Sequence, residues 1–116
     1  MLFRSEALDE CEIDSFCAIA GCGPAYAYMF IEALANGAEK CGIPSDRAIK
    51  YASKMIRGAC LMALETETDP KTLCQNVCSP GGATIEGVKV LEASEFSGTV
   101  SSAIEAAFKR TKELGK

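Results

Sequence analysis

Apolar positions recur along most of this chain at spacings of three and four residues, the period of helices that pack through one face. The clearest series is Ile49, Ala52, Ile56, Ala59 and Ala63. No segment of useful length shows the alternation of apolar and polar residues that is typical of a strand. The pattern therefore predicts an all-α fold, with helices over 6–19, 24–41, 45–67, 70–77, a segment beginning near 82, and 99–114.

The predicted helix 24–41 is apolar around most of its circumference. Its polar residues form one narrow stripe of Glu32, Asn36, Glu39 and Lys40. Such a helix should be buried on nearly all sides. Because a chain of 116 residues cannot easily cover it alone, we expect a homodimer with long helices interlocked between two copies. Ala33, Gly37 and Cys41 recur every four residues and would let another helix come close.

Composition narrows the range of partners and compartments. The formal charge is −4, and no basic block or basic–aromatic run is present, which disfavours nucleic acid. No apolar run approaches the ~20 residues of a membrane span. The N-terminus lacks the basic-then-apolar plan of a signal peptide. We therefore expect a cytoplasmic protein with no membrane partner.

The chain has seven cysteines and no histidine. An odd number of cysteines without a secretory signal argues against a disulfide framework. Cys74 and Cys78 are four residues apart and share a helix face, but no second close pair has zinc-ribbon spacing. The pattern favours free thiols that act as small buried hydrophobes, and no metal site is predicted.

Residues 78–87, CSPGGATIEG, connect two predicted helices with almost no side-chain bulk. Pro80 ends the first helix, and Gly81 and Gly82 permit an unusual backbone path. The first amides of the next helix have no partner within it and carry the positive end of its dipole. A carboxylate or phosphate could reach them, with the Thr84 hydroxyl beside it. The alternative is an ordinary helix connector with Thr84 as a first-turn residue.

A second glycine segment, GCGPAY at 21–26, superficially matches a dinucleotide-binding motif. A tyrosine stands where the third glycine or alanine should be, a proline lies inside the turn, and no strand precedes it. We therefore interpret the segment as a tight kink between two helices. A role as the wall of a ligand pocket remains the alternative.

Taken together, three stretches resemble the C-terminal domain of pyrroline-5-carboxylate reductase: GCGPAYAYMFIEAL, the helix after GIP, and DPKTLCQNVCSPGGATIEGVKVLE. The resemblance covers about 6–114. It implies an unmatched tail at 1–5 and a helical dimerisation and substrate-binding domain at 6–116. That family reduces 1-pyrroline-5-carboxylate to L-proline with NADPH or NADH, and its helices interlock between subunits, with a larger oligomer of dimers as a further possibility. The family's nucleotide-binding domain has no counterpart here, so this chain alone is expected to be inactive.

The resemblance also implies roles for particular residues. The amides of Ala83 and Thr84 would bind the substrate carboxylate, and the Thr84 hydroxyl would face the ring nitrogen as the catalytic group. A protonated imine or a relayed water would supply the proton, with Thr84 orienting it. Ser79 and Gly82 would line the same turn.

Two more residues match family positions outside the turn. Glu10 corresponds to an acidic residue that contacts the substrate, and Asn76 lies near the cofactor. A solvated first-turn carboxylate and a helix-surface amide are the respective alternatives. The family commonly has serine where this chain has Ala20 and Cys22, so a polar role for that kink is in doubt.

Two other hypotheses stay open at this point. The chain could be a helical oligomerisation module of another two-domain dehydrogenase, with no preference for this substrate. It could also be a thiol- or metal-binding helical protein. Binding of proline would favour the reductase hypothesis. Dimerisation without imino-acid binding would favour the oligomerisation module, and stoichiometric zinc would favour the thiol- or metal-binding protein.

Overall fold

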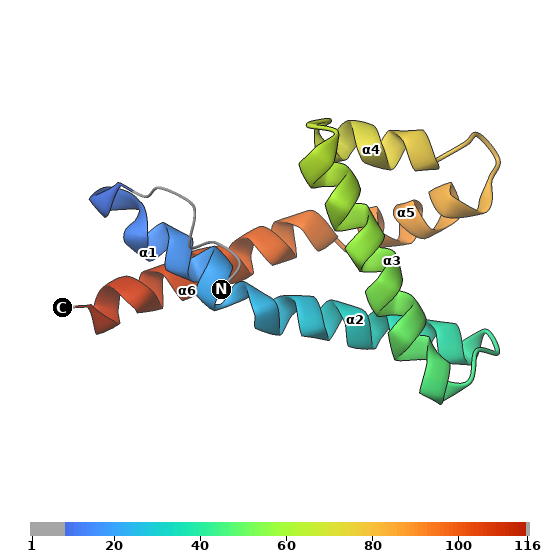
Figure 1. The fold of residues 1–116 in the computed structure, drawn as a ribbon, viewed down its shortest axis with the longest axis horizontal. Helices are drawn as coiled ribbons and strands as arrows, with labels where there is room; N and C mark the ends of the chain where they lie inside the picture. The colour runs from blue at the N-terminus through green and yellow to red at the C-terminus, as the bar shows by residue number, and fades with distance from the viewer. Residues whose placement is uncertain (1–8, 116) are drawn as a thin grey trace. The chain divides into compact units, whose positions relative to one another are not determined.

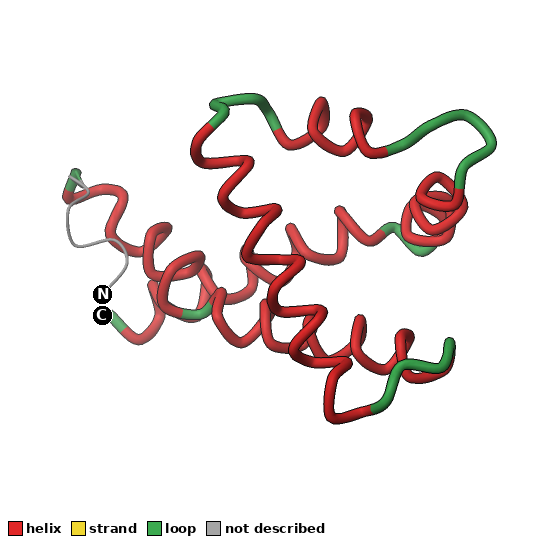
Figure 2. The backbone as a smooth tube through the Cα atoms, turned by 45° about the vertical axis from the view of Figure 1, so that its right-hand side comes forward, coloured by secondary structure: helices red, strands yellow, loops and turns green. Residues whose placement is uncertain are grey.

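A computed structural model describes residues 9–115, and these residues form helices and turns without a strand (Figures 1 and 2). The order is η1 (Glu10–Glu12), α1 (Ile13–Phe16), η2 (Cys17–Gly21), α2 (Gly23–Lys40), α3 (Ser45–Glu65), α4 (Pro70–Val77), α5 (Ala83–Ala93) and α6 (Phe96–Leu114). The all-α prediction is confirmed for this part of the chain. The start of the predicted helix 6–19 lies outside the described residues.

The described residues fall into two compact units. One unit comprises the residues up to Tyr28 together with those from Glu95 onward, and the other is Met29–Ser94. Helix α2 begins in the first unit and ends in the second.

In the first unit, α6 packs against α1 and the π-helical segment η2. Ala18 of η2 is fully buried there, and Ile104, Ala107 and Phe108 of α6 are half-buried. Val100 of the same helix is exposed in the single chain.

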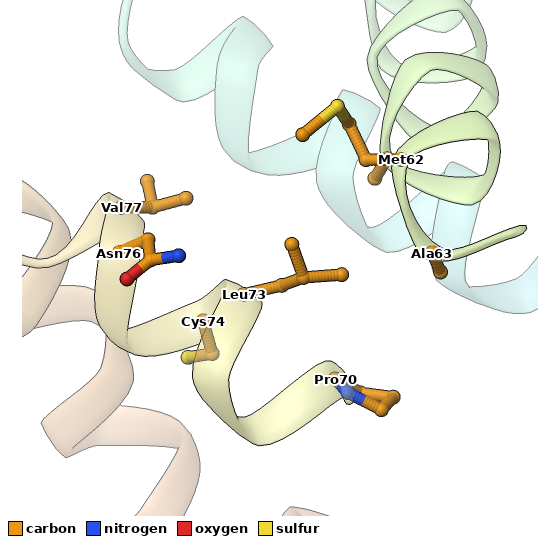
Figure 3. A pocket seen from close by; sticks show the side chains of 8 residues that line it. Met62, Ala63, Pro70, Leu73, Cys74, Asn76 and Val77 are labelled. Atoms are coloured by element: carbon orange, nitrogen blue, oxygen red, sulfur yellow. The ribbon is translucent and has the colours of Figure 1, made fainter. Parts of the chain in front are cut away.

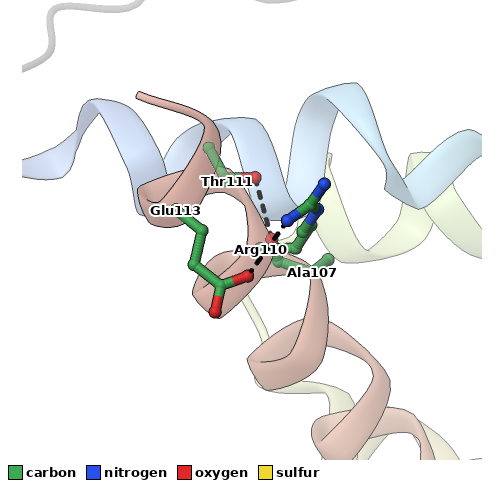
Figure 4. Close-up of polar contacts among 4 residues, drawn as sticks. All are labelled: Ala107, Arg110, Thr111 and Glu113. Carbon is green, nitrogen blue, oxygen red and sulfur yellow. Dashed lines mark hydrogen bonds and ion pairs between the residues drawn. The ribbon is translucent and has the colours of Figure 1, made fainter. Parts of the chain in front are cut away.

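The last turns of α6 are held by local polar contacts (Figure 4). The Thr111 hydroxyl donates to the Ala107 carbonyl at 2.8 Å, and Arg110 pairs with Glu113 at 3.3 Å. The Lys112 ammonium lies 5.3 Å from the centre of the Phe108 ring. The ion pair is exposed and contributes little to stability, so the half-buried apolar face is what holds this helix in place.

In the second unit, Gly42 ends the turn after α2 with a φ of +106°, a conformation that glycine adopts without strain. The Ile43 amide donates back to the Ala38 carbonyl at 3.0 Å, which closes the helix end as a Schellman motif. The buried residues of this unit are Ala35 of α2 with Ala48 and Ala52 of α3. Small side chains at these positions allow close packing, but they bury little apolar area.

Helix α4 begins where the sequence predicts. The Asp69 carboxylate accepts hydrogen bonds from the Thr72 amide and the Thr72 hydroxyl, each at 2.9 Å, and Pro70 occupies the first helical turn. Because proline lacks an N–H that would need a partner, this combination fixes the helix start at low cost.

The large apolar side chains of α2 and α3 are not covered within one copy. Tyr28 is 69% exposed and Met29 is 68% exposed, while Met55 and Met62 of α3 are also exposed. The 24–41 helix is therefore not buried on nearly all sides within the single chain, which agrees with the expectation that a chain of this length cannot cover it alone. Its burial by a second copy stays a prediction.

Two further expectations need correction. Glu10–Lys40 forms one helical stretch that is long and apolar enough to cross a membrane by length and composition, although the core helix of a soluble protein passes the same test. The cysteines are free, but none is buried in the single chain: Cys22 and Cys78 are half-exposed and the other five are exposed. Their burial, like that of α2, would require a covering partner.

Candidate functional site

Five residues, Cys78 to Gly82, connect α4 and α5, and the last four of them form a turn. The Gly82 amide donates to the Ser79 carbonyl at 2.9 Å. Pro80 follows Ser79, and Gly81 has a φ of +74°. Proline in the second position and a left-handed glycine in the third are the signature of a type II turn. The unusual backbone path expected from the sequence is therefore present.

Gly82 is packed against the start of this turn. A Cβ atom on Gly82 would lie 2.7 Å from the Ser79 Oγ and 3.1 Å from the Ser79 carbonyl oxygen. The hydroxyl could rotate away, but the carbonyl is fixed by the turn hydrogen bond. Glycine at this position thus keeps the turn closed and leaves the helix start uncovered.

Helix α5 begins at Ala83 with Gly82 as its N-cap, in agreement with the sequence prediction. Gly82 has extended backbone angles and supplies no side chain to cap the first amides. Glu86 lies in the first turn, but its carboxylate pairs with Lys89 at 3.2 Å. The positive end of the helix dipole is therefore available for an anion at Ala83 and Thr84.

Thr84 is exposed in the first turn of α5. Across the described chain, no side chain or carbonyl is recorded as a partner of its hydroxyl. The Thr84 hydroxyl is therefore free to donate a hydrogen bond to a bound molecule or to accept one from it. Ser79, Gly82, Ala83 and Thr84 lie in this one short segment, and their roles in substrate binding stay predictions.

An apolar pocket of about 410 Å³ lies near this turn, between α3 and α4 (Figure 3). Asn76 is the one predicted site residue in its lining, which is otherwise apolar: Ala59, Met62, Ala63, Pro70, Leu73, Cys74 and Val77. None of the turn residues lines the pocket. The pocket was not predicted, because the sequence does not show how α3 and α4 pair.

Glu10 is exposed in η1, in the first unit. Its neighbour Glu12 accepts a hydrogen bond from the Asp9 amide at 3.2 Å and so caps this helix start, which leaves Glu10 uninvolved. The turn and Asn76 belong to the second unit. A joint role of Glu10 with the turn stays a prediction.

The metal hypothesis gains no support from the described residues. Residues 9–115 contain no group of three or more His, Cys, Asp or Glu side chains placed to hold a metal ion. Cys74 and Cys78 do lie close together, and burial raises the pKa of the Cys78 thiol, with the neighbouring Cys74 adding to the effect.

Comparisons with known proteins match this chain over most of its length. The family described as pyrroline-5-carboxylate reductase dimerisation matches residues 10–114. Pyrroline-5-carboxylate reductase 2 of Rattus norvegicus is 42% identical over 107 residues, which cover 92% of this chain and 33% of the rat protein. Pyrroline-5-carboxylate reductase of Pisum sativum is 44% identical over 106 residues, which cover 91% of this chain and 39% of the pea protein.

Solved structures resemble the fold equally well. The pyrroline carboxylate reductase of Plasmodium falciparum, crystallised with NADP bound, matches with a TM-score of 0.88 and 36% identity, over 94% of this chain and 42% of that one. The reductase of Coxiella burnetii matches with a TM-score of 0.88 and 39% identity, over 95% of this chain and 41% of that one.

The chain spans between a third and two fifths of the length of the rat and pea relatives. The match nevertheless extends over almost all of the described residues, from η1 to the end of α6. The chain therefore belongs to the pyrroline-5-carboxylate reductase dimerisation family.

Proposed function

We propose that this chain is the dimerisation and substrate-binding part of a pyrroline-5-carboxylate reductase, which reduces 1-pyrroline-5-carboxylate to L-proline. The observation that carries the proposal is the turn from Ser79 to Gly82, which leads into an uncapped helix start with an exposed threonine. Family membership supports the same reading. It also favours this function over an oligomerisation module of another dehydrogenase.

The turn would bind the substrate through its carboxylate. The amides of Ala83 and Thr84 point along the helix axis, where an anion is favoured by both hydrogen bonds and the dipole. Because Gly82 has no side chain, the carboxylate can approach these amides closely. Amides also hold the anion without offering a nucleophile that could attack the imine carbon.

Thr84 would orient the reacting nitrogen. Reduction adds a hydride to the imine carbon, and the nitrogen must carry a proton or accept one. The Thr84 hydroxyl is too weak an acid to supply that proton alone, so a protonated imine or a water held by Thr84 is the better source. Thr84 would therefore act through a hydrogen bond to the reacting nitrogen. This bond would be strongest in the transition state, where the charge on the nitrogen changes.

NADPH or NADH would supply the hydride when bound. The described residues include no strand that could precede a phosphate-binding glycine loop, and the glycine segment near α2 is helical. These residues therefore do not fit a complete dinucleotide site. The cofactor would bind mainly to a nucleotide-binding domain outside 9–115, with Asn76 as the contact from this chain.

Two copies of the chain would form the functional unit. The exposed apolar side chains of α2 and α3, including Tyr28, Met29 and Met55, are the surface that a second copy would cover. The family described as a dimerisation domain supports this assembly. The helices of the two copies would interlock, and further dimers could join them.

A chimera tests the proposed activity. The nucleotide-binding part of the pea relative would be joined to this chain in place of its own C-terminal part, and NADPH oxidation would be followed with pyrroline-5-carboxylate. We expect substrate-dependent oxidation that yields proline. The control is the 116-residue chain alone, which should show no NADPH oxidation. A dimeric chimera that binds NADPH but leaves the imine unreduced would contradict the proposal.

A further inference from the structure

Cys74 and Cys78 form a close pair of thiols at the end of α4. Cys74 is exposed, and Cys78 is the half-exposed residue that caps the helix. The two thiols are near enough for Cys74 to contribute to the raised pKa of Cys78. On a regular helix, residues four apart have Cα atoms about 6.2 Å apart. That separation lies within the range of about 4.4–6.8 Å that a disulfide spans.

Forming a disulfide here requires a local change in the backbone. Disulfide-bonded cysteines have Cβ atoms only about 3.5–4.5 Å apart, closer than on a regular helix. The end of α4 is already irregular, because the Cys78 amide is shared between the Cys74 carbonyl at 3.3 Å and the Gln75 carbonyl at 3.1 Å. The last turn of α4 can therefore tighten further with a small loss of hydrogen bonding.

Such a change would reach the candidate substrate turn directly. Cys78 has extended backbone angles and is covalently followed by Ser79, whose carbonyl accepts the hydrogen bond that closes the turn. A shift of the Cys78 backbone therefore alters the direction in which the Ser79 carbonyl points. No rigid element lies between the thiol pair and the turn to absorb the change.

The two thiols also differ in reactivity. Burial raises the pKa of Cys78, and the neighbouring Cys74 thiol raises it further. Cys78 is therefore held as a thiol over a wider pH range than usual. The exposed Cys74 is the sulfur that meets an oxidant from solution, and Cys78 is placed to react second.

We propose that Cys74 and Cys78 are a redox pair, and that their disulfide changes the conformation of the Ser79–Gly82 turn. Hydrogen peroxide is the oxidant. The Cys74 thiolate attacks one peroxide oxygen, the O–O bond breaks, and hydroxide leaves, giving a sulfenic acid on Cys74. The Cys78 sulfur then attacks the Cys74 sulfur, the S–O bond breaks, and water is released. In sum, two thiols are oxidised, one peroxide is reduced to two waters, and a dithiol reductant reverses the change.

The chain offers a matched control in Cys60. It is exposed on α3, and no cysteine lies three or four residues from it. Cys60 can therefore be oxidised as an isolated thiol but has no helical neighbour with which to form a disulfide. Loss of its thiol would report general oxidation.

Mass spectrometry tests whether the pair forms. The folded 116-residue chain is treated with hydrogen peroxide, its remaining thiols are alkylated, and it is digested with trypsin. Cleavage after Lys71 and Lys89 gives one peptide that contains both cysteines of the pair. We expect this peptide to lose both alkyl labels and two hydrogen atoms, while the Cys60 peptide keeps its label. Dithiothreitol before alkylation should restore both labels, and dilution of the protein should not change the result.

The same experiment can overturn the proposal. If both labels remain on the paired cysteines while Cys60 loses its own, the two thiols do not react as a pair. In the Cys78→Ser variant we expect a sulfenic acid on Cys74 that dimedone traps. Absence of that adduct would contradict the assigned order of attack.

A second measurement tests the effect on the turn. With ¹⁵N-labelled glycine, the amide resonances of Gly81 and Gly82 should shift on oxidation and return on reduction. Cys60→Ser should behave like the parent, and Cys78→Ser should show no such shift. If the disulfide forms while both resonances stay in place, the coupling to the turn is refuted. The oxidation and reduction of the parent protein alone decide whether the disulfide is coupled to the turn, even if a variant does not fold. None of these measurements depends on the proposed enzymatic function.

Discussion

Gly81 determines the geometry of the candidate site at the scale of a single residue. Its φ of +74° lies in the left-handed region, which side-chain-bearing residues adopt only at a cost. The sequence indicated this path, since Pro80 followed by two glycines limits the possible turns. It could not show that Gly82 packs against Ser79, because that contact arises only when the turn closes.

Replacing Gly81 by alanine should lower the free energy of unfolding by about 1–2 kcal/mol, the cost of a left-handed alanine. Gly87 is the matched control. It lies inside α5 with open space where a Cβ would be. Gly87→Ala should raise the free energy of unfolding by about 0.5–1 kcal/mol, because alanine favours helix. Urea unfolding at one protein concentration measures both. Equal stability of Gly81→Ala and the parent would show that the turn is not held in this conformation.

Thr84→Ala tests the proposed hydrogen bond to the reacting nitrogen in the active chimera. We expect kcat/KM to fall roughly 10- to 100-fold, equivalent to ~1.4–2.8 kcal/mol at the transition state. KM should rise less than kcat falls, because the backbone amides still hold the carboxylate. Thr84→Ser keeps the hydroxyl and should retain most of the activity. A kcat for Thr84→Ala within about twofold of the parent would leave Thr84 a structural residue.

Individual helices show which boundaries a sequence can specify. The start of α4 was predicted correctly because Asp69 and Pro70 act locally, through a cap and a fixed φ. Helix α6 begins at Phe96, whereas Thr99 was expected. Gly98 disfavours a helix interior, and Glu95 adopts a left-handed conformation that its residue type does not signal. Helix ends that depend on such residues are accessible only from the structure.

The cap of α4 should make this element sensitive to acid. Hydrogen bonds from the Thr72 amide and hydroxyl lower the pKa of Asp69 below its ordinary value of 3.8. Because the folded-state pKa is depressed, the stabilisation is fully present above pH 3.8 and is lost as the pH falls through the lower folded-state value.

Asp69→Asn separates this titration from the cap itself, since asparagine caps helices without ionising. The parent should lose stability relative to Asp69→Asn as the pH falls below the ordinary pKa of aspartate. Above that pH, the difference between their free energies of unfolding should be constant. Urea midpoints at a series of pH values measure the effect. Parallel acid profiles for the two proteins would contradict it.

Burial across the described residues is the part of the structure that sequence could not predict. The apolar helix 24–41 was recognised, but one copy does not supply side chains that cover it. The buried residues of one copy are all alanines: Ala18, Ala35, Ala48 and Ala52. Periodicity identifies an apolar face, whereas its burial depends on the matching surface. The roles of the turn residues and of Glu10 in a shared site, both expected from the resemblance, likewise stay predictions.

We expect a stable homodimer whose interface exceeds the ~2,000 Å² typical of obligate pairs. Gly37 tests whether α2 packs closely against the second copy. In one chain a Cβ on Gly37 would meet nothing, so Gly37→Ala should stabilise an isolated helix. In a closely packed dimer the added methyl should cost about 1–3 kcal/mol and weaken association by roughly 5- to 150-fold. Sedimentation equilibrium on Gly37→Ala and Gly87→Ala measures the difference. A folded monomer of the parent at micromolar concentration would refute the dimer.

The exposure of Tyr28 and Met29 in one copy also sets the order of events when the protein forms. Helices form within about a microsecond, but these side chains would leave water only when two copies collide. Recovery of tyrosine fluorescence after dilution from urea should therefore speed up as protein concentration rises, while the helical circular dichroism signal recovers first at an unchanged rate. A concentration-independent fluorescence phase would contradict this order. At low expression, the appearance of the dimer would thus be governed by how often two new chains meet.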